Sequence, residues 1–201
     1  MTALPLGYSD LPAGKLANVV TCLEMRAKPV LRPVPANGLS LSPLDRRDLA
    51  GYRALYRAVG QDWMWFSRLV MADENLKGIL ADPAREPFVL MKEGERAGIL
   101  ELDFASTPGE CEIAFFGVTP QAIGFGAGRY LMNEAIMRAW SKPISRLWVH
   151  TCTHDHPGAL AFYIRSGFTP YQRLVEIHDD PRLQGYLPET ASPHIPLIRP
   201  T

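Results

Sequence analysis

The chain contains little cysteine for its length of 201 residues. It has three cysteines and no CxxC pair: Cys22, Cys111 and Cys152. An odd number of cysteines without close pairs argues against a disulfide framework. We therefore expect the protein in a reducing cytoplasm.

The sequence also lacks a long apolar run, a basic leader and an excess of one charge. No stretch approaches the roughly 18 apolar residues of a membrane span, and the first residues do not read as a signal peptide. The 21 basic and 21 acidic residues cancel. A neutral chain argues against an extended nucleic-acid or anionic-membrane surface, so we expect neither partner.

No internal repeat is present, and the chain divides by composition. Residues 1–43 are rich in proline and glycine and are expected to form an arm, with a strand over Val19–Met25. Residues 44–201 are expected to form a single domain. Ser42 and Pro43 indicate a helix start, with Ser42 as the N-cap, and a second helix is predicted over residues 73–80.

Strand patterns begin at residue 88. Apolar runs alternate with turn residues and predict strands, and two later segments have helical spacing. The predicted strands cover residues 88–91, 97–104, 111–118 and 146–151 with a last one from 168, and the helices end near Trp140 and span 157–166. This order predicts a mixed α/β sheet with helices packed against it.

Three glycines at alternate positions, Gly124, Gly126 and Gly128, lie between a predicted strand and a predicted helix. Glycines at a helix start allow free backbone N–H groups to approach an anion such as a pyrophosphate. The G-x-G-x-G spacing does not match a Rossmann fingerprint, and the Gly-Lys-Ser/Thr of a P-loop is missing. A helix start that needs small residues only for packing remains an alternative.

A second motif follows about 30 residues later, from His156 to Phe168. It is similar to the GNAT pattern N-x-x-A-x-x-φ-Y-x-x-x-G-F, where φ is apolar, with His156 at the Asn position and Tyr163 at the Tyr position. The glycine loop resembles the family's pyrophosphate loop, V-x-P-x-x-[QR]-G-x-G-x-G. Val118 and Pro120 fall on that pattern, while Ile123 stands where Gln or Arg is usual. A shifted register would place Gln121 there instead.

The resemblance to GNAT N-acetyltransferases implies a mixed, mostly antiparallel sheet split by a V-shaped opening. The resemblance also implies that acetyl-CoA binds as the co-substrate in that opening, between the strands over residues 111–118 and 146–151. No metal is implied. The residues expected to bind it are Phe116, Gly117, Val118, Ile123, Gly124, Phe125, Gly126, Ala127, Gly128, Arg129 and His156.

The same resemblance implies direct attack by an amine, which needs a general base and a general acid. Tyr163 matches the usual acid. Glu112 is the expected base, because alternation on its strand would place it on one face with Ala114, Phe116 and Val118. Rival bases are Glu101, Asp103, His150, Asp155 and His156.

The acceptor pocket is expected to include Trp63, Trp65 and His150. The alternating His150, Cys152, His154 and His156 admit three interpretations: a zinc site, part of the active-site surface, or a structural cluster. Cys152 as a nucleophile is a further alternative.

The function that we predict is acetyl transfer to an amine acceptor, which is a small molecule or a peptide. Two alternatives remain open. One is transfer of a longer acyl chain, and the other is a non-catalytic acyl-CoA-binding module. The identity of the amine and the existence of a homodimer are also left open.

Overall fold

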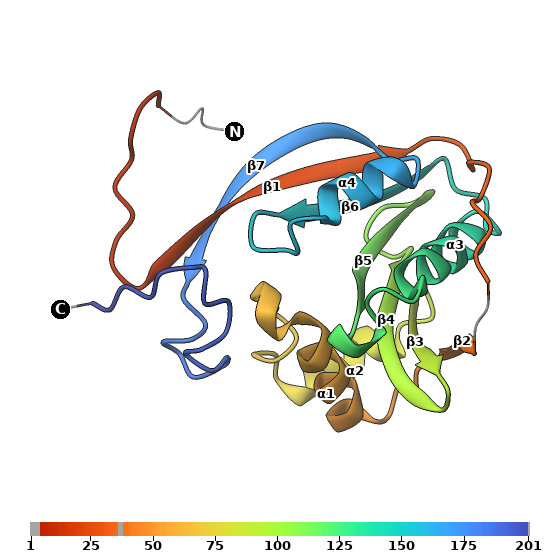
Figure 1. Ribbon diagram of the computed structural model, residues 1–201, viewed down its shortest axis with the longest axis horizontal. Helices are drawn as coiled ribbons and strands as arrows, with labels where there is room; N and C mark the ends of the chain where they lie inside the picture. Colours follow the sequence, from red (N-terminus) through yellow and green to blue (C-terminus); the bar gives the residue numbers. More distant parts are fainter. Residues whose placement is uncertain (1–4, 36–37, 201) are drawn as a thin grey trace.

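The computed structural model describes residues 5–35 and 38–200. These residues form seven strands, four α-helices and two short 3-10 helices (Figure 1). The strands are β1 (Lys15–Met25), β2 (Leu39–Pro43), β3 (Arg85–Lys92), β4 (Glu95–Asp103), β5 (Glu110–Val118), β6 (Arg146–Cys152) and β7 (Thr169–Asp179). The helices are α1 (Leu49–Gly60), η1 (Gln61–Trp63), α2 (Asp73–Ala81), η2 (Pro120–Ala122), α3 (Ala127–Ala139) and α4 (Ala159–Arg165).

One sheet contains all the strands of the described segments, in the order β2-β3-β4-β5-β6-β1-β7. Only β5 and β6 run parallel, and every other neighbouring pair is antiparallel. The expected α/β class and the mostly antiparallel, mixed sheet are therefore confirmed.

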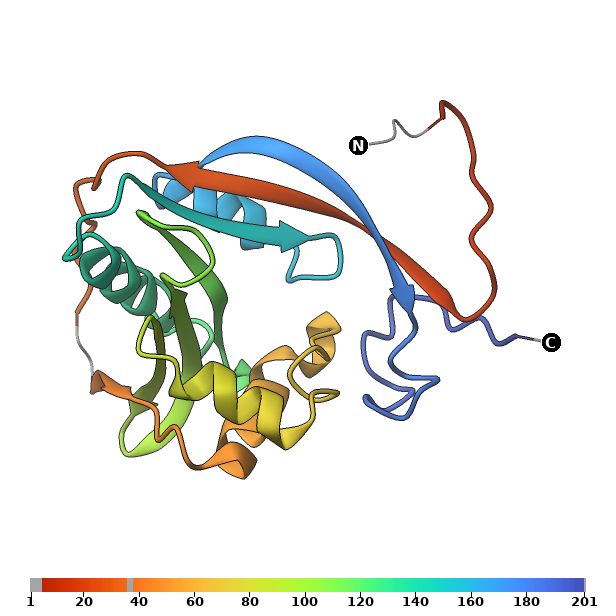
Figure 2. The same ribbon diagram turned by 180° about the vertical axis from the view of Figure 1, so that it is seen from behind.

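β1 is a full member of this sheet. It lies between β6 and β7, with Val20 opposite Cys152 and Asn18 opposite Glu176. Figure 2 shows β1 and β7 as two long strands that arch together away from the body of the molecule. The expected strand over Val19–Met25 is thus longer at its start. A domain boundary at residue 44 would separate this strand from β6 and β7, its two neighbours in the sheet.

The helix start predicted at Ser42 is wrong. Pro43 ends β2 opposite Phe88, so Ser42 and Pro43 are extended. The first helix begins at Leu49, where Asp48 accepts a hydrogen bond from the Gly51 backbone N–H at 2.8 Å. Asp is as good an N-cap as Ser, and pairing with β3 keeps the earlier segment in the sheet.

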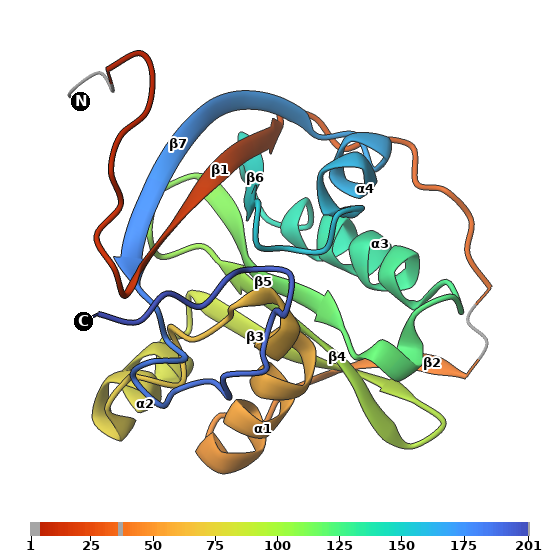
Figure 3. The same ribbon diagram turned by 60° about the vertical axis from the view of Figure 1, so that its left-hand side comes forward.

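The two faces of the sheet carry different helices (Figure 3). We call the face covered by α3 and α4 the α3 face, and the opposite face, covered by α1 and α2, the α1 face. Leu100, Ile113 and Leu131 belong to the apolar core on the α3 face. Tyr52, Leu76 and others form the core on the α1 face.

β5 and β6 separate soon after they meet. They pair only where Glu110–Glu112 lies beside Arg146–Trp148, although β5 continues to Val118 and β6 to Cys152. Beyond this point no strand lies between them, which is the V-shaped opening expected from the sequence. Figure 1 shows the green β5 and the teal β6 diverging from each other.

The segment after β7 returns to the loop that follows α1. Leu187 and Ala191 pack on Met64 and Leu16 in a small apolar cluster, and Ser192 Oγ donates a hydrogen bond to the Asp62 carbonyl at 2.6 Å. This segment therefore supports the η1 loop at the mouth of the opening. No helix in residues 5–35 and 38–200 is long and apolar enough to cross a bilayer.

Candidate active site

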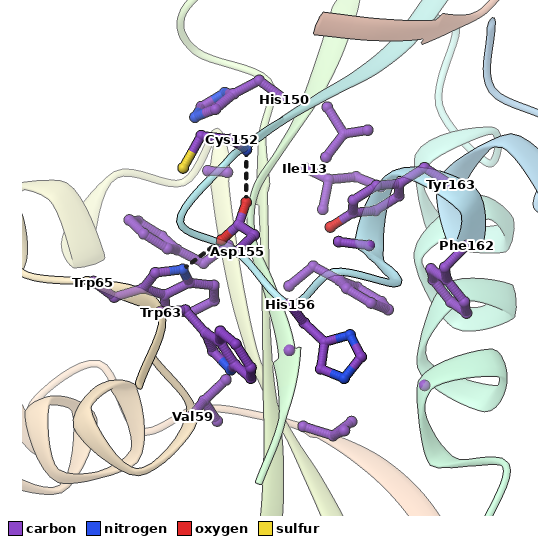
Figure 4. A pocket seen from close by; sticks show the side chains of 18 of the residues that line it. Val59, Trp63, Trp65, Ile113, His150, Cys152, Asp155, His156, Phe162 and Tyr163 are labelled. Atoms are coloured by element: carbon purple, nitrogen blue, oxygen red, sulfur yellow. Dashed lines mark hydrogen bonds between the residues drawn. The ribbon is translucent and has the colours of Figure 1, made fainter. Parts of the chain in front are cut away.

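A cavity of about 1020 Å³ occupies the V-shaped opening. It extends from the glycine loop, past the diverging ends of β5 and β6, to the α1 face of β1 and β7. Figure 4 shows its central part, where residues from the η1 loop, β6 and α4 point toward one another. The cavity thus joins the two regions that the sequence assigned to the acyl donor and the acceptor.

The glycine loop presents a row of free backbone N–H groups. Among the described residues, no acceptor lies within hydrogen-bond range of the N–H groups from Gly124 to Arg129. The N–H of the next residue, Tyr130, donates to the Gly126 carbonyl at 2.9 Å. These amides lie at the start of α3, where the helix dipole favours an anion. The loop therefore offers a cradle for a phosphate group.

Two glycines in the loop have a backbone conformation that side chains rarely adopt. Gly124 has φ +90° and Gly126, the N-cap of α3, has φ +77°. Gly128 is different, because its φ is ordinary and a Cβ there would meet only the Phe162 ring at 3.9 Å. Gly128 thus leaves space that the protein itself does not fill.

A bulge interrupts the pairing of β5 with β4. Leu102 lies opposite Ile113 but Glu101 lies opposite Phe115, so Ala114 is the extra residue. A bulge reverses the alternation of side chains beyond it. Phe115 therefore packs on the α1 face, and Phe116 on the α3 face.

The prediction that Glu112 shares a face with Phe116 and Val118 is consequently wrong. Glu112 stands between the buried Cys111 and Ile113, both on the α3 face, so it is on the α1 face. The alternation rule failed because it assumes an unbroken strand.

The bulge also determines which amides point into the opening. The Thr119 N–H donates to the Ala97 carbonyl of β4 at 2.9 Å. Because N–H groups alternate along a strand, those of Phe116 and Val118 point the opposite way, toward β6. No β6 residue pairs with them, since the pairing ends at Glu112 and Trp148.

Tyr163 lies on α4 with its ring buried against Phe116 and Phe168. Figure 4 shows its hydroxyl directed into the cavity, and no residue within the described chain hydrogen-bonds to it. Burial raises the pKa of this phenol well above its ordinary value. The hydroxyl is therefore protonated at neutral pH and free to donate to a ligand.

Glu112 and His150 meet at the narrow end of the opening. Glu112 Oε1 lies 3.5 Å from His150 Nδ1, and the Glu112 side chain is 15% exposed against 48% for His150. The carboxylate of Glu112, which accepts from the His150 imidazole, raises the pKa of His150 above its ordinary value. The pair lies on the cavity surface and can hold or pass on a proton.

The two rival carboxylates on β4 are committed to structural bonds. Glu101 is buried and accepts hydrogen bonds from Tyr52 and, at 3.0 Å, from Arg68. Asp103 pairs with Arg85 at 2.6 Å and accepts two backbone N–H groups of the turn that follows β4. Each carboxylate is held by a cationic partner, so we expect neither to act as the base.

Asp155 links the two sides of the cavity. Its Oδ2 accepts from Thr151 Oγ1 at 2.7 Å and from the Cys152 N–H at 2.9 Å, and its Oδ1 accepts from Trp65 Nε1 at 3.3 Å. Figure 4 shows the bonds to Cys152 and Trp65. Asp155 is therefore a positioning residue rather than a free base.

The other residues expected in the acceptor pocket are nearby. The Trp63 ring lies edge-on to His156 at 5.1 Å between centroids, and His156 Nδ1 accepts the Gly158 N–H at 3.0 Å. His156 thus holds the start of α4.

The alternating histidines do not converge. His150 contacts Glu112, His156 contacts Trp63, and His154 is buried beside His178. Among the residues that the structure describes, no group of three His, Cys, Asp or Glu side chains could hold a metal ion. The arrangement favours separate roles for these side chains.

Cys152 lines the cavity, but its thiol is poorly suited to nucleophilic attack. Burial raises the pKa of this thiol to about 11, so little thiolate exists at neutral pH.

Three further cavity residues were not found from the sequence: Asn18, Glu176 and His178. They come from β1 and β7, on the α1 face. No local motif marks them, because only the pairing of β1 with β7 brings them to the cavity.

Solved structures with a similar fold were found by comparison. A functionally unknown conserved protein from Staphylococcus epidermidis superimposes with a TM-score of 0.55 and 16% identity over 83% of this chain, and this chain spans 63% of that protein. An aminoglycoside acetyltransferase from an uncultured soil metagenomic sample has a TM-score of 0.55 and 22% identity over 70% of this chain and 94% of its own.

The ribosomal-protein-S18-alanine N-acetyltransferase from Escherichia coli is similar to the same degree, with a TM-score of 0.55 and 15% identity. The match covers 71% of this chain and 94% of that one. At these identities the likeness shows the fold alone. No protein of curated function matches the chain.

The family assignment comes from the sequence itself. The family model described as Acetyltransferase (GNAT) family matches residues 52–168, from α1 to the end of the second motif. This match covers more than half of the chain and includes both the glycine loop and Tyr163. The chain therefore belongs to the GNAT family of acetyltransferases.

Proposed function

We propose that the enzyme transfers an acetyl group from acetyl-CoA to an amine by direct attack. The observation that carries this proposal is the position of two sets of free donors along one cavity. The amides of residues 124–129 are at one end, and the Phe116 N–H and the Tyr163 hydroxyl are in the middle. A thioester that carries phosphates needs donors at two separate places, one for the anionic phosphates and one for the reactive carbonyl group.

The glycine loop fits the pyrophosphate of acetyl-CoA. Its amides have no acceptor of their own, and the space above Gly128 is empty. We propose that residues 123–129 bind the pyrophosphate, and that Phe116, Gly117 and Val118 lie along the pantetheine. The exposed side chains of Ile123 and Phe125 leave the backbone to make this contact. His156 would contribute by holding the start of α4. When bound, acetyl-CoA supplies the activated acetyl group.

The remaining catalytic roles are assigned to residues of this chain. The Phe116 N–H stabilises negative charge on the thioester oxygen. Tyr163 protonates the leaving thiolate, and Glu112, with His150 beside it, takes the proton of the amine through a water molecule. Trp63, Trp65 and His150 line the path by which the acceptor enters.

The single-unit organisation is also a proposal. β1 pairs on both sides with strands of the later sequence, which supports one unit that includes residues 15–25. The three cysteines are all unpaired, in keeping with the reducing cytoplasm that we expected. The oligomeric state stays open, and light scattering tests whether the chain forms a homodimer.

The test is a panel of amines incubated with acetyl-CoA and the enzyme, with free thiol release as the readout. Longer acyl-CoA donors are compared in parallel, because a preference for them would replace acetyl transfer by longer-chain transfer. Binding of acetyl-CoA without thiol release for any amine would favour the non-catalytic module.

A further inference from the structure

The part of the cavity formed by β1 and β7 has its own pair of polar side chains. There Asn18 of β1 and Glu176 of β7 lie opposite each other in the sheet, and both line the cavity. Asn18 Nδ2 donates to Glu176 Oε2 at 3.0 Å. This leaves Glu176 Oε1 and Asn18 Oδ1 as acceptors that no described residue supplies with a donor.

The state of Asn18 is unusual for a structural residue. Its side chain is only 4% exposed, and its Oδ1 is buried without a hydrogen-bond partner in the described chain. Buried acceptors are normally paired, because an unpaired one destabilises the fold. A ligand with N–H donors would complete this site.

The charges that face this part of the cavity favour a cation. Glu112 and Glu176 are acidic, whereas the nearby Arg68 is neutralised by Glu101 at 3.0 Å. His154 does not oppose a cation, since burial and then the neighbouring His178 lower its pKa below the ordinary value. A carboxylate with an adjacent amide oxygen is a suitable partner for an ammonium group.

The distance from the β6 side of the cavity follows from the register. Cys152, which lies across the cavity from Tyr163 in Figure 4, is opposite Val20, two residues from Asn18. With about 4.8 Å between strands and about 3.4 Å per residue, Asn18 Cα lies about 8 Å from Cys152 Cα, and Glu176 Cα about 12 Å. A molecule with amines at both ends can span this interval.

We propose that the acceptor is a diamine or polyamine, and that Glu176 and Asn18 bind its second ammonium group while the first amine is acetylated near Tyr163. This inference rests on the proposed function for the identity of the reacting end. The binding contact itself involves no acyl transfer, so it can be tested separately.

The experiment compares linear diamines, from diaminobutane to diaminodecane, with monoamines of equal chain length. Calorimetry without any acyl donor measures their binding to the wild type, Glu176→Gln and Asn18→Leu. Removing one charge-assisted bond at an exposed carboxylate is expected to weaken diamine binding by about fivefold in Glu176→Gln. Monoamine binding should be unchanged.

Glu74→Gln is the matched control, because it removes one negative charge from the exposed surface of α2. It should leave diamine binding as in the wild type. Asn18→Leu removes the orphaned acceptor and should also reduce the preference for diamines over monoamines.

The outcomes separate the inference from the function. Equal affinity of wild type for diamines and monoamines, or an equal loss for both in Glu176→Gln, would overturn the second ammonium site. Thiol release with monoamines in the same preparation would then still support amine acetylation. Diamine binding that depends on Glu176 without any thiol release would keep the site and contradict the proposed transfer.

Discussion

Trp65 Nε1 donates a hydrogen bond to Asp155 Oδ1 at 3.3 Å, across the mouth of the cavity. The two residues are 90 positions apart, one in the loop after α1 and the other in the loop between β6 and α4. Trp65 also packs on Tyr56 and Phe115. One side chain thus connects the core of the α1 face to the acceptor side of the site.

Trp65→Phe tests this connection, because it keeps an aromatic ring and removes the N–H. We expect a loss of about 1–2 kcal/mol in unfolding free energy, since a hydrogen bond to a carboxylate is lost. The acceptor KM should rise more than the acetyl-CoA KM. Trp148→Phe is the control, as Trp148 does not line the cavity and no described residue accepts a bond from its indole N–H. Equal effects of the two variants would contradict a specific role for Trp65.

The glycine loop is tested by Gly128→Val. A Cβ at this position meets only the Phe162 ring, at 3.9 Å, so we expect the fold to tolerate the valine while a phosphate loses its space. We expect acetyl-CoA affinity to fall by roughly tenfold or more, which corresponds to about 1.4 kcal/mol or more. Gly126→Val should also lose affinity, but its φ of +77° adds strain to the fold.

Gly78→Val on α2 is the control for helix propensity, because a Cβ there has no neighbour within 4 Å. Calorimetry and thermal melting are measured for all variants. Unchanged acetyl-CoA affinity in Gly128→Val would move the phosphate site away from this loop.

Tyr163→Phe removes the hydroxyl that faces the cavity and keeps the ring between Phe116 and Phe168. Burial holds the pKa of the phenol high, so the proton is available throughout the working pH range. We expect kcat to fall roughly 10²-fold and acetyl-CoA affinity to stay near that of the wild type. Tyr186→Phe, at an exposed position, is the control. A wild-type kcat in Tyr163→Phe would reduce Tyr163 to a packing role.

Glu112→Gln removes the basic group and leaves the shape. The reacting amine is mostly protonated near neutral pH, so we expect kcat/KM to fall there by roughly 10²-fold and to recover in part at high pH. A variant with the wild-type pH profile would exclude Glu112 as the base and transfer the role to His150.

The same variant has a second, independent readout. Glu112 raises the pKa of His150, so Glu112→Gln should lower that pKa, which NMR titration of the imidazole measures. A raised pKa in the folded state stabilises the protein below the unfolded pKa, and this stabilisation is lost as pH rises through the folded one. The variant should therefore lose more stability at about pH 5–6 than at about pH 9.

Cys152→Ala tests the covalent alternative. The pKa of the thiol is raised to about 11 by burial, so only about 10⁻⁴ of it is thiolate at neutral pH. We expect alkylation by iodoacetamide to be slow and kcat of the variant to stay within about twofold of wild type. An acyl-enzyme trapped on Cys152 by mass spectrometry would contradict direct attack.

The sequence alone predicted the parts that depend on neighbours along the chain. Glycines at alternate positions and a strand before them locate the loop at the start of α3, because helix ends and turns are local. The motif that contains Tyr163 likewise identifies α4 and the strand after it. Both motifs, together with the order of elements, were enough for the family and the fold class.

The tertiary structure decided what depends on pairing between distant segments. A bulge at Ala114 placed Glu112 and Phe116 on opposite faces, against simple alternation. β1 lies between β6 and β7, more than 120 residues away in sequence. No local pattern encodes such a partner, because strand pairing is set by packing and register over the whole sheet. That pairing alone brings Asn18 and Glu176 to the cavity.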